Sequence, residues 1–478
     1  MLFNSLDFAV FLPIVFVLYW FVAKRHLRVQ NALVVVASYV FYGWWDYRFL
    51  ALIAFSTLVD YTIGLQLEQQ HQPKRRLALL WISVFVNIGL LGFFKYYNFF
   101  VDAFVDAFSL FGLSIQPNTL NIILPVGISF YTFQTMSYTI DVYRGKLKPT
   151  RDFISFAAFV SFFPQLVAGP IERATHLLPQ FYKTRSFDYS KAVDGLRQML
   201  WGLFKKIVIA DNCAQFVTII FDGYGSYSGS TLLLGGVLFA FQIYGDFSGY
   251  SDIAIGTARL FGFDLRQNFA FPYFSRDIAE FWRRWHISLS TWFRDYVYIP
   301  LGGSQVGEWK VLRNVFVIFI VSGFWHGANW TFIVWGALNA LYFVPLLLLK
   351  RNRVHTGVVA ESRTLPNFKE LMGIGGTFFL TVIAWVFFRA ASVEEAFSYL
   401  QGVFSRSLFT VPEIRPSFLL VFIVLFLVVE WFGRREHYAI ERLWLSYPRA
   451  LRWGIYYVIA MLIFLYGGKE QEFIYFQF

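Results

Sequence analysis

The sequence predicts an all-α, polytopic integral membrane protein, and three observations support this fold class. Of its 478 residues, 57% are hydrophobic and only 15% are charged, whereas soluble domains carry about 25% charged residues. Apolar runs recur from end to end, and roughly 11–13 of them are long enough to be transmembrane or re-entrant helices, since about 20 helical residues cross the hydrocarbon core. Lipid offers no partner for backbone amides, so the chain must be helical wherever it faces lipid.

The composition also limits the functional class. The net charge is +11, but the basic residues lie in short loops between apolar runs, which is typical of a cytoplasmic face and predicts no nucleic-acid partner. The single cysteine, Cys213, excludes an internal disulfide and any multi-cysteine metal site, and we predict no metal. Because we find no internal repeat, low-complexity tract or flexible linker, we expect residues 1–478 to form one membrane domain.

The first element is a retained membrane span at residues 8–22. Its cations, Lys24, Arg25 and Arg28, follow the apolar run, whereas a cleaved signal peptide carries its cations before that run. We therefore interpret this segment as a helix that stays in the mature protein.

Basic clusters then set the orientation of the later spans. Before residue 160, the chain crosses the membrane twice between one basic cluster and the next, so these clusters fall on one side. The positive-inside bias identifies that side as cytoplasmic. Both chain ends are then predicted to lie outside, because the last span, at about 453–467, runs outward. The clusters comprise Lys24, Arg25, Arg28, Lys74, Arg75, Arg76, Arg144, Lys146, Lys148 and Arg151, with Arg434, Arg435, Arg449 and Arg452 near the end.

In the middle of the chain, Gly, Pro and charged residues interrupt the apolar runs. Residues 124–145 and 162–174 place helix breaks beside aromatic runs, which alone is weak evidence of function. In residues 242–273, four polar residues interrupt an apolar run that resumes at once: Asp246, Ser248, Ser251 and Asp252. Such carboxylates either line a wet cavity that binds a ligand or form a structural ion pair or helix cap, and the sequence leaves both open.

Residues 276–304 predict an aromatic helix. Trp282, Trp285, Leu289 and Trp292 recur at three- and four-residue intervals, which gives one helical stripe. Arg283 and Arg284 follow Glu280 at pairing distance, and His286 is a candidate second catalytic group. The alternative is an anchor helix at the membrane interface whose histidine only forms hydrogen bonds.

Residues 321–343 carry the strongest candidate, His326. The histidine lies in an apolar setting beside Trp325, and Asn329 is three positions on, within reach of the same helical face. Gly323 and Gly327 form a small-xxx-small pair that permits close helix approach or a local break in the helix. A desolvated, neutral imidazole can accept a proton from a hydroxyl; the alternatives are a structural histidine or a ligand to a metal or haem.

Some motifs are missing from the sequence. There is no GxxxxGK[ST] phosphate loop, no GxSxG nucleophile elbow, no HExxH and no paired-cysteine metal motif. The sequence therefore gives no support to three functional classes: a nucleotide-driven pump, a serine hydrolase and a zinc protease.

Several segments together resemble the membrane-bound O-acyltransferase family, in the bacterial branch that acts in polysaccharide O-acetylation and teichoic-acid D-alanylation. The resemblance covers nearly the whole chain in the right order, except that residues 350–415 carry no pattern we can match. The segments that carry it are LPVGISFYTFQ, FFPQLVAGPIER, DFSGYSDIAIG, FWRRWHISLSTWFRDYVYIPLGG and WHGANWTFIVWG.

This resemblance implies a fold and a site. It implies helices around a central tunnel, a catalytic core at about 120–345 and an extracytoplasmic tail at 468–478. The family's invariant histidine corresponds to His326 and its second signature histidine to His286. We expect substrate contacts from the polar and aromatic residues of the matched segments, namely Asn329, Trp325, Asp246, Ser248, Asp252, Arg283 and Arg284.

The resemblance also implies a reaction. A cytosolic thioester, acetyl-CoA for an acetyl-transferring member, would donate its acyl group across a bacterial inner membrane to an exported polysaccharide such as alginate. No cofactor is expected to stay bound, and a periplasmic or extracellular SGNH-type acetyltransferase is the expected partner. The end of the chain, FIYFQF, looks like the terminal hexapeptide of this branch. Tyr475 could therefore carry the acyl group as a tyrosyl ester, or the tail could be only a hydrophobic plug.

Three other functions stay open at this stage. D-alanyl transfer to teichoic acid is the same acyl-transfer chemistry with a D-alanyl group in place of the acetyl group. A lipid or protein acyltransferase would prefer a long-chain donor. A non-catalytic transporter of polysaccharide or acyl donor would not depend on His326.

Overall fold

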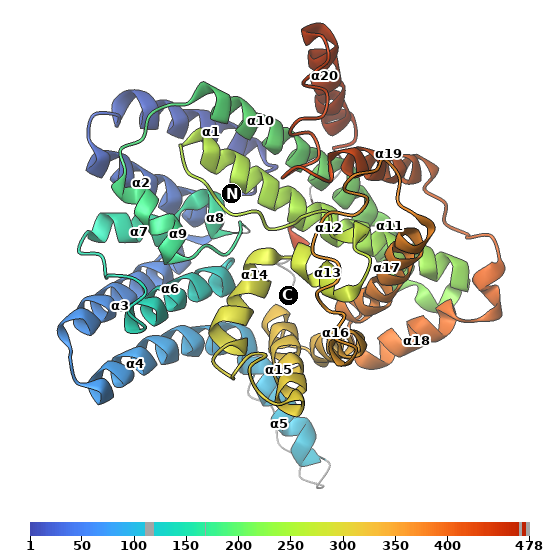
Figure 1. The fold of residues 1–478 in the computed structure, drawn as a ribbon, viewed down its shortest axis with the longest axis horizontal. Coiled ribbons are helices and arrows are strands. Elements are labelled where there is room, and N and C mark those ends of the chain that lie inside the picture. The colour runs from blue at the N-terminus through green and yellow to red at the C-terminus, as the bar shows by residue number, and fades with distance from the viewer. Residues whose placement is uncertain (110–118, 168, 468–470, 475–478) are drawn as a thin grey trace. The chain divides into compact units, whose positions relative to one another are not determined.

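The computed structural model describes residues 1–109, 119–167, 169–467 and 471–474. Every regular element in this part of the chain is a helix, as predicted (Figure 1). The chain divides into two compact units: the first comprises Met1–Val193 with Thr257–Arg266, and the second comprises Asp194–Gly256 with Gln267–Phe478. The prediction of one domain with a core at about 120–345 stays a prediction.

The first unit contains the helices of the N-terminal part of the chain. They are α1 (Leu6–Val17), η1 (Leu18–Val22), α2 (Leu27–Asp46), η2 (Tyr47–Phe49), α3 (Leu50–Gln69), α4 (Pro73–Leu91), η3 (Gly92–Tyr96), α5 (Tyr97–Ser109), α6 (Ile128–Tyr143), α7 (Phe153–Ser161), α8 (Phe163–Leu166), α9 (Ala174–Leu177) and η4 (Leu178–Tyr182). The predicted first span, residues 8–22, is helical throughout as α1 and η1.

The second unit contains the remaining helices, and α10 and α12 each have one end in the first unit's sequence. They are α10 (Tyr189–Leu203), η5 (Phe204–Ala210), α11 (Asp211–Asp222), η6 (Tyr224–Ser226), α12 (Gly229–Leu260), η7 (Pro272–Phe274), α13 (Ile278–Arg284), α14 (Ile287–Phe293), η8 (Arg294–Tyr298), α15 (Glu308–His326), α16 (Trp330–Leu348), α17 (Phe368–Arg389), α18 (Val393–Val403), η9 (Arg406–Phe409), α19 (Ser417–Gly433) and α20 (Arg449–Leu465).

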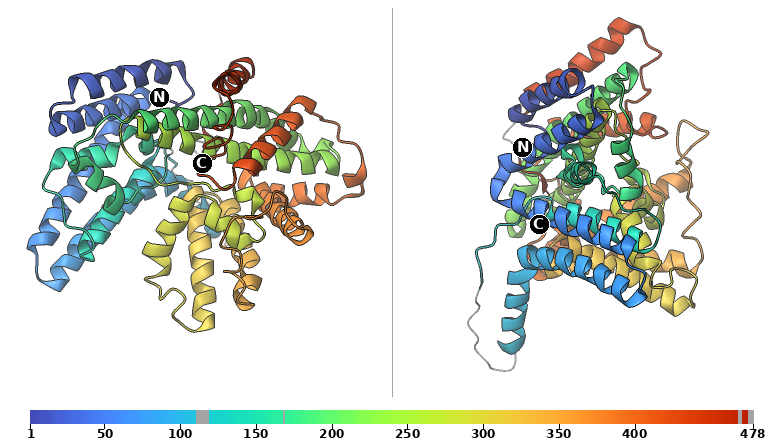
Figure 2. Two further views of the ribbon diagram at one scale, coloured as in Figure 1. Left: turned by 45° about the horizontal axis from the view of Figure 1, so that its top comes forward. Right: turned by 90° about the vertical axis from the view of Figure 1, so that its left-hand side faces the viewer.

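Aromatic contacts and a buried polar cluster hold the first unit together. Helix α1 lies beside α2 (Figure 2), and the rings of Phe11 and Phe41 lie 5.8 Å apart. Helices α3, α4 and α6 surround the buried carboxylate of Asp60. That carboxylate accepts hydrogen bonds from Asn87 (2.8 Å), Thr139 (3.0 Å) and Ser83. These bonds stabilise a carboxylate that would otherwise be costly inside an apolar bundle.

In the second unit, glycines let helices approach to backbone contact. A Cβ on Gly249 of α12 would lie 2.7 Å from the carbonyl oxygen of Gly202 on α10. Helices α15 and α16 form a hairpin, visible side by side in Figure 1, in which a Cβ on Gly323 would lie 2.2 Å from the carbonyl oxygen of Phe332. The predicted role of Gly323 in close helix packing is confirmed.

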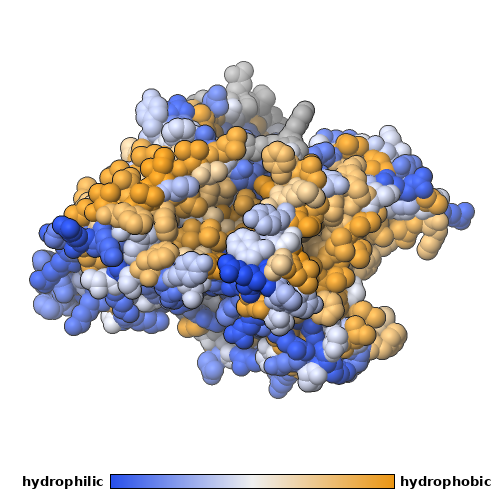
Figure 3. Space-filling view, turned by 90° about the horizontal axis from the view of Figure 1, so that it is seen from above, coloured by the Kyte–Doolittle hydropathy of each residue, from blue (hydrophilic) through white to orange (hydrophobic). Residues whose placement is uncertain are grey.

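The apolar helices are those of a multi-pass membrane protein. Among the described residues, five helical stretches are long and apolar enough to span a bilayer, and three shorter apolar helices accompany them. Hydrophobic side chains cover wide areas of the surface (Figure 3). They include Leu6, Phe85 and Phe464, each more than 75% exposed. Apolar surface on this scale requires a lipid environment, and the predicted polytopic all-α class is confirmed.

One sequence-based expectation for the second unit is wrong. Residues 276–304 do not form one helix with a continuous aromatic stripe, because the helix ends at Arg284 and restarts at Ile287. Trp285 and Trp292 are buried in the protein and are not interfacial anchors. Residues 350–415, which carried no recognisable pattern, contain α17 and α18, and α17 proves to line the site.

Candidate active site

His326 is the last residue of α15, and it lies inside an aromatic cage. Its side chain is buried. Its ring lies 4.9 Å from that of Trp325, 5.2 Å from that of Trp335 on α16 and 5.3 Å from that of Phe388 on α17. Three aromatic rings from three helices thus surround the buried imidazole.

The turn after His326 separates it from Asn329. Helix α15 ends at His326, so the expectation that the two residues share one helical face is wrong. Asn329 instead caps α16: its side chain accepts from Thr331 N at 3.0 Å and donates to the carbonyl of Ala391 at 2.8 Å. Gly327 permits this tight turn, because a Cβ there would lie 2.0 Å from the Phe332 ring. A substrate contact of Asn329 stays a prediction.

His286 occupies the break between α13 and α14 in a left-handed conformation, with φ 44° and ψ 54°. This conformation is unfavourable for a residue with a Cβ and recurs at functional sites. It turns the imidazole into the protein interior, where the side chain is 1% exposed. His286 belongs to none of the five candidate spans, and burial lowers the pKa of its imidazole to about 3. The ring is therefore neutral at physiological pH.

Asn268 fixes the tautomer of His286. The backbone N–H of Ser288 donates to Oδ1 of Asn268 at 3.2 Å, which identifies that atom as the amide oxygen. Nδ1 of His286 lies 3.1 Å from the same oxygen and must donate to it. The basic lone pair of the ring then belongs to Nε2. The amide nitrogen of Asn268 donates to Ser251 Oγ of α12 at 3.3 Å, so Ser251 supports this arrangement.

Trp325 connects the two histidines. Its ring centroid lies 6.2 Å from that of His286 and 4.9 Å from that of His326. A second aromatic connection runs through Trp385 of α17, whose ring lies 5.1 Å from Trp285 and 5.6 Å from Trp335. The two histidines predicted from separate segments therefore lie in one aromatic cluster, which also contains the predicted residue Trp325.

Asp252 pairs with a buried lysine beside this cluster. Lys205 of η5 contacts Asp252 Oδ2 at 2.5 Å, and Gln198 donates to Oδ1 at 2.7 Å. A cavity of about 10 Å³, the size of one water molecule, is lined by Lys205 and Asp252 together with Ser251 and Asn268. This polar region adjoins the support of His286, and the predicted central tunnel stays a prediction.

Asp246 also pairs with a lysine, and it contacts the end of the chain. Lys206 lies 2.8 Å from Asp246 Oδ1 and 2.7 Å from Asp211 Oδ1. Asp246 Oδ2 accepts from the backbone N–H of Ile474 at 2.6 Å. The structural alternative for both carboxylates, an ion pair, is present, and their roles toward a substrate stay predictions. Tyr475 lies outside the described residues.

The remaining predicted residues bind other parts of the protein. Ser248 Oγ donates to the carbonyl of Tyr244 within α12 at 2.6 Å. Arg283 donates to the carbonyls of Asn352 (2.9 Å) and His355 (2.7 Å). Arg284 pairs with Glu280, as its spacing predicts, and also donates to the carbonyl of Gly357 at 2.8 Å. Both arginines thus fasten residues 352–357 against α13.

Several members of the site were not predicted from the sequence. The adjacent lysines 205 and 206 interrupt an apolar run, a signal that was visible but not used. Glu430, a lone carboxylate in the apolar α19, accepts from the Tyr244 hydroxyl at 2.7 Å. Asn268 and Phe388 carried no signal that a single sequence could show.

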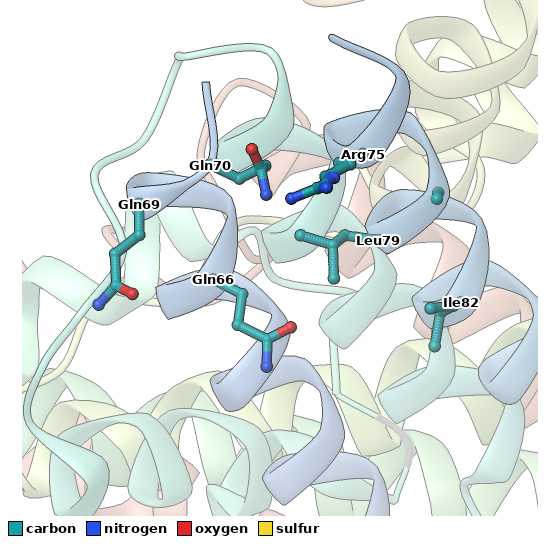
Figure 4. A pocket seen from close by; sticks show the side chains of 7 residues that line it. Gln66, Gln69, Gln70, Arg75, Leu79 and Ile82 are labelled. Carbon is teal, nitrogen blue, oxygen red and sulfur yellow. The ribbon is translucent and has the colours of Figure 1, made fainter. Parts of the chain in front are cut away.

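A separate groove lies in the first unit, between the end of α3 and the start of α4 (Figure 4). Its volume is about 490 Å³. The lining combines amides and one cation with apolar side chains: Gln66, Gln69, Gln70, Arg75, Ala78, Leu79 and Ile82. It contains none of the predicted site residues, which all belong to the second unit.

The chain is similar to several known proteins. The description of the membrane-bound O-acyltransferase family matches residues 147–388. A "probable alginate O-acetylase" of Pseudomonas aeruginosa is 41% identical over 448 residues, which is 92% of this chain and 82% of the relative. A peptidoglycan O-acetyltransferase of Helicobacter pylori is 37% identical, over 84% of this chain and 80% of the relative. A teichoic acid D-alanyltransferase of Streptococcus thermophilus is 27% identical, over 65% and 82%.

Proposed function

Because the chain belongs to the membrane-bound O-acyltransferase family, we propose that this O-acyltransferase moves acetyl groups from a cytosolic thioester to an exported polysaccharide. The observation that carries the proposal is the pair of buried histidines, His326 and His286, placed around Trp325 in one aromatic cluster. The relatives that cover more than nine tenths of the chain are named for alginate O-acetylation, which makes alginate the first acceptor to test.

The proposed chemistry uses the imidazole of His326 inside its aromatic cage. His326 accepts the proton of an acceptor hydroxyl as its oxygen attacks the thioester carbonyl carbon. A C–O bond forms and the C–S bond breaks, and the proton passes from the imidazolium to the departing thiolate. The donor is acetyl-CoA, whose thiolate leaves as coenzyme A. The aromatic walls keep water from hydrolysing the thioester in competition with the hydroxyl.

His286 assists through its fixed tautomer. With Nδ1 donating to Asn268, Nε2 carries the lone pair and can accept a hydrogen bond from a hydroxyl or a water molecule. A pKa of about 3 keeps this imidazole neutral. Its role is to orient the acceptor or to exchange its proton, while His326 acts as the general base. We propose that the other predicted residues shape the substrate path around the two histidines. They are Asp246, Ser248, Asp252, Arg283, Arg284, Asn329 and Trp325.

The end of the chain supplies the first acceptor in this proposal. The tail returns to the site, where Phe473 packs on Tyr250 at 4.4 Å and on Phe247 at 5.8 Å. Phe247 in turn contacts His286, with 4.6 Å between the rings. Tyr475 is two residues further along and would carry the acetyl group as a phenyl ester, which is reactive enough for onward transfer. A periplasmic SGNH-type acetyltransferase then takes the group to the polysaccharide.

This proposal also fixes the orientation in the membrane. The basic loops face the cytoplasm of a bacterial inner membrane and both chain ends face the outside, as the positive-inside bias predicts. The thioester then enters from the basic side, and the acetylated tail is presented on the other side.

The test is the acetate content of the exported polymer in a deletion strain complemented with the wild type, His326→Ala or Tyr475→Phe. We expect His326→Ala to lower polymer acetate at least 100-fold, the size of a general-base contribution, and Tyr475→Phe to abolish acetylation. Full acetylation with His326→Ala would contradict the catalytic proposal and favour a transporter. Full acetylation with Tyr475→Phe would remove only the relay. Alanine esters in place of acetate would indicate D-alanyl transfer.

A further inference from the structure

Two adjacent lysines of η5 form two buried ion pairs with α12, and within the described part of the tail, residues 471–474, only one of these pairs makes a contact. Lys205 pairs with Asp252 and Lys206 pairs with Asp246, at 2.5 Å and 2.8 Å. Both lysine side chains are less than 5% exposed. The two pairs are thus alike in burial and in the helices that supply them, but Lys206 also pairs with Asp211, at 2.7 Å. Charges at such depth are retained where they have a specific task.

The Lys206–Asp246 pair binds the backbone of the tail at two points. Lys206 Nζ donates to the carbonyl of Gln471 at 3.0 Å, and Asp246 Oδ2 accepts from the N–H of Ile474 at 2.6 Å. The two points are three residues apart, so they set both the position and the direction of the segment. Between them, Phe473 is completely buried against Tyr250 and Phe247.

We propose that Lys206 and Asp246 form a clamp that holds the C-terminal segment of this chain in one register beside His286. The clamp deepens the function proposed above, on which its role in transfer rests: Lys206 and Asp246 are positioning residues for the acyl acceptor on the tail. A slip of one residue moves an extended chain by about 3.3 Å. Reacting atoms tolerate about 1 Å of misplacement before the rate falls steeply, so a relay of this kind requires a fixed register.

The buried charges of Lys206 and Asp246 explain why these residues bind the backbone of the tail. A buried ion pair needs further hydrogen bonds for its remaining lone pairs and protons. The backbone of residues 471 and 474 supplies one acceptor and one donor of the right kind. Undocking the tail would remove one donor from buried Asp246 and one acceptor from Lys206, which would keep its pairs with Asp246 and Asp211. The ion pair and the docked tail therefore stabilise each other.

The experiment measures how easily the tail leaves its site. Ile474→Cys, in a Cys213→Ala background, places one thiol where the native side chain is 2% exposed. Its maleimide labelling rate in detergent-solubilised full-length protein reports the undocked fraction. We expect Asp246→Asn and Lys206→Met to raise this rate at least tenfold. Asp252→Asn is the matched control: it breaks the neighbouring pair, which makes no contact with the described tail, and should leave the labelling rate unchanged.

A second pair of variants leaves every charged group of the clamp intact. Ile474→Pro removes the N–H that donates to Asp246 and also replaces the buried Ile474 side chain, for which Ile474→Ala is the side-chain control. Glu472→Pro imposes the same backbone restriction and removes an N–H for which the described residues include no acceptor. With Phe473→Cys as the reporter, Ile474→Pro should label at least tenfold faster than Glu472→Pro. Equal labelling rates in this comparison, or an unchanged rate in Asp246→Asn, would overturn the clamp.

Polymer acetate separates the clamp from the proposed function. Strains with Asp246→Asn or Ile474→Pro should lose acetate in proportion to tail undocking, at wild-type expression levels. Faster labelling with full polymer acetate would overturn the positioning role of Lys206 and Asp246 in transfer. The conclusion that these residues hold the tail in place would stand. Retained acetate with His326→Ala would overturn the function, and the labelling results would still decide the clamp.

Discussion

At the scale of single residues, the site depends on a histidine held in a backbone conformation that it does not favour. A left-handed residue with a Cβ costs roughly 1–3 kcal/mol, and the contacts of His286 must offset this cost. The principal polar contact is with Asn268, which also accepts from the backbone N–H and hydroxyl of Ser288 at 3.2 Å and 2.8 Å. One amide oxygen therefore fixes both the turn and the tautomer.

Asn268→Leu should impair the transfer reaction without preventing membrane insertion. The substitution removes the acceptor for His286 Nδ1, so the ring loses its fixed tautomer. A neutral hydrogen bond contributes about 1 kcal/mol, which corresponds to a loss of roughly tenfold or less in initial rate if only orientation is affected. Rates of acetyl transfer in membrane vesicles measure the effect. The double variant Asn268→Leu/His286→Ala should be no slower than His286→Ala; an additional tenfold loss would show that Asn268 acts independently.

Individual residues also show how far a single sequence could predict the site. His326 and His286 stood out as polar residues beside aromatic ones, the family resemblance assigned them and Trp325 to a site, and the structure brings the three together. Asn268 was missed because an amide in a loop carries no signal until its partners are known. The partners of Asp246 and Asp252 were missed because pairing across helices depends on packing that periodicity does not report.

At the scale of helices, glycines decide which elements can meet. Gly336 of α16 faces α15, where an added Cβ would lie 2.4 Å from the carbonyl oxygen of Phe319. Gly323 makes the reciprocal approach from α15. This hairpin presents His326 at the end of α15 and Trp335 on α16, so its close packing sets the distance between the imidazole and one wall of its cage. The small-residue pattern predicted this contact, whereas the repeat of aromatic residues in 276–304 did not predict the helix break at His286.

Gly323→Ala should destabilise the α15–α16 hairpin. The new methyl group would meet backbone and not a flexible side chain, so the helices must separate, at a cost of about 1–3 kcal/mol for overpacking. The temperature of half-maximal loss of monodisperse protein, followed by fluorescence-detected size exclusion, should fall by several degrees. Gly376→Ala on α17 is the control, since an added Cβ there meets nothing within 4 Å. The same fall in both variants would contradict the packing argument.

At the scale of the whole molecule, composition alone predicted the all-α membrane class, because hydrophobic length is a requirement of the bilayer itself. The contacts of polar side chains within the spans were harder to predict from the sequence. Asp60 is an example, because its carboxylate is stabilised by Asn87 and Thr139 from two other helices. The sequence of its own helix does not indicate these partners. The proposed direction of transfer depends on orientation, which basic loops predict and which a labelling experiment can measure.

Cysteine labelling in spheroplasts should give an alternating pattern along the first three spans. In a Cys213→Ala background, Tyr47→Cys lies in the turn between α2 and α3, where the native side chain is 75% exposed. His71→Cys lies in the exposed turn between α3 and α4, beside the basic cluster at 74–76. The cost of moving basic loops across the membrane during insertion keeps the second turn inside. An impermeant maleimide should therefore label Tyr47→Cys in intact spheroplasts, and should label His71→Cys only after permeabilisation. The reverse pattern would place the thioester entrance on the outside, which no cytosolic donor could reach, and would exclude the proposed direction of transfer.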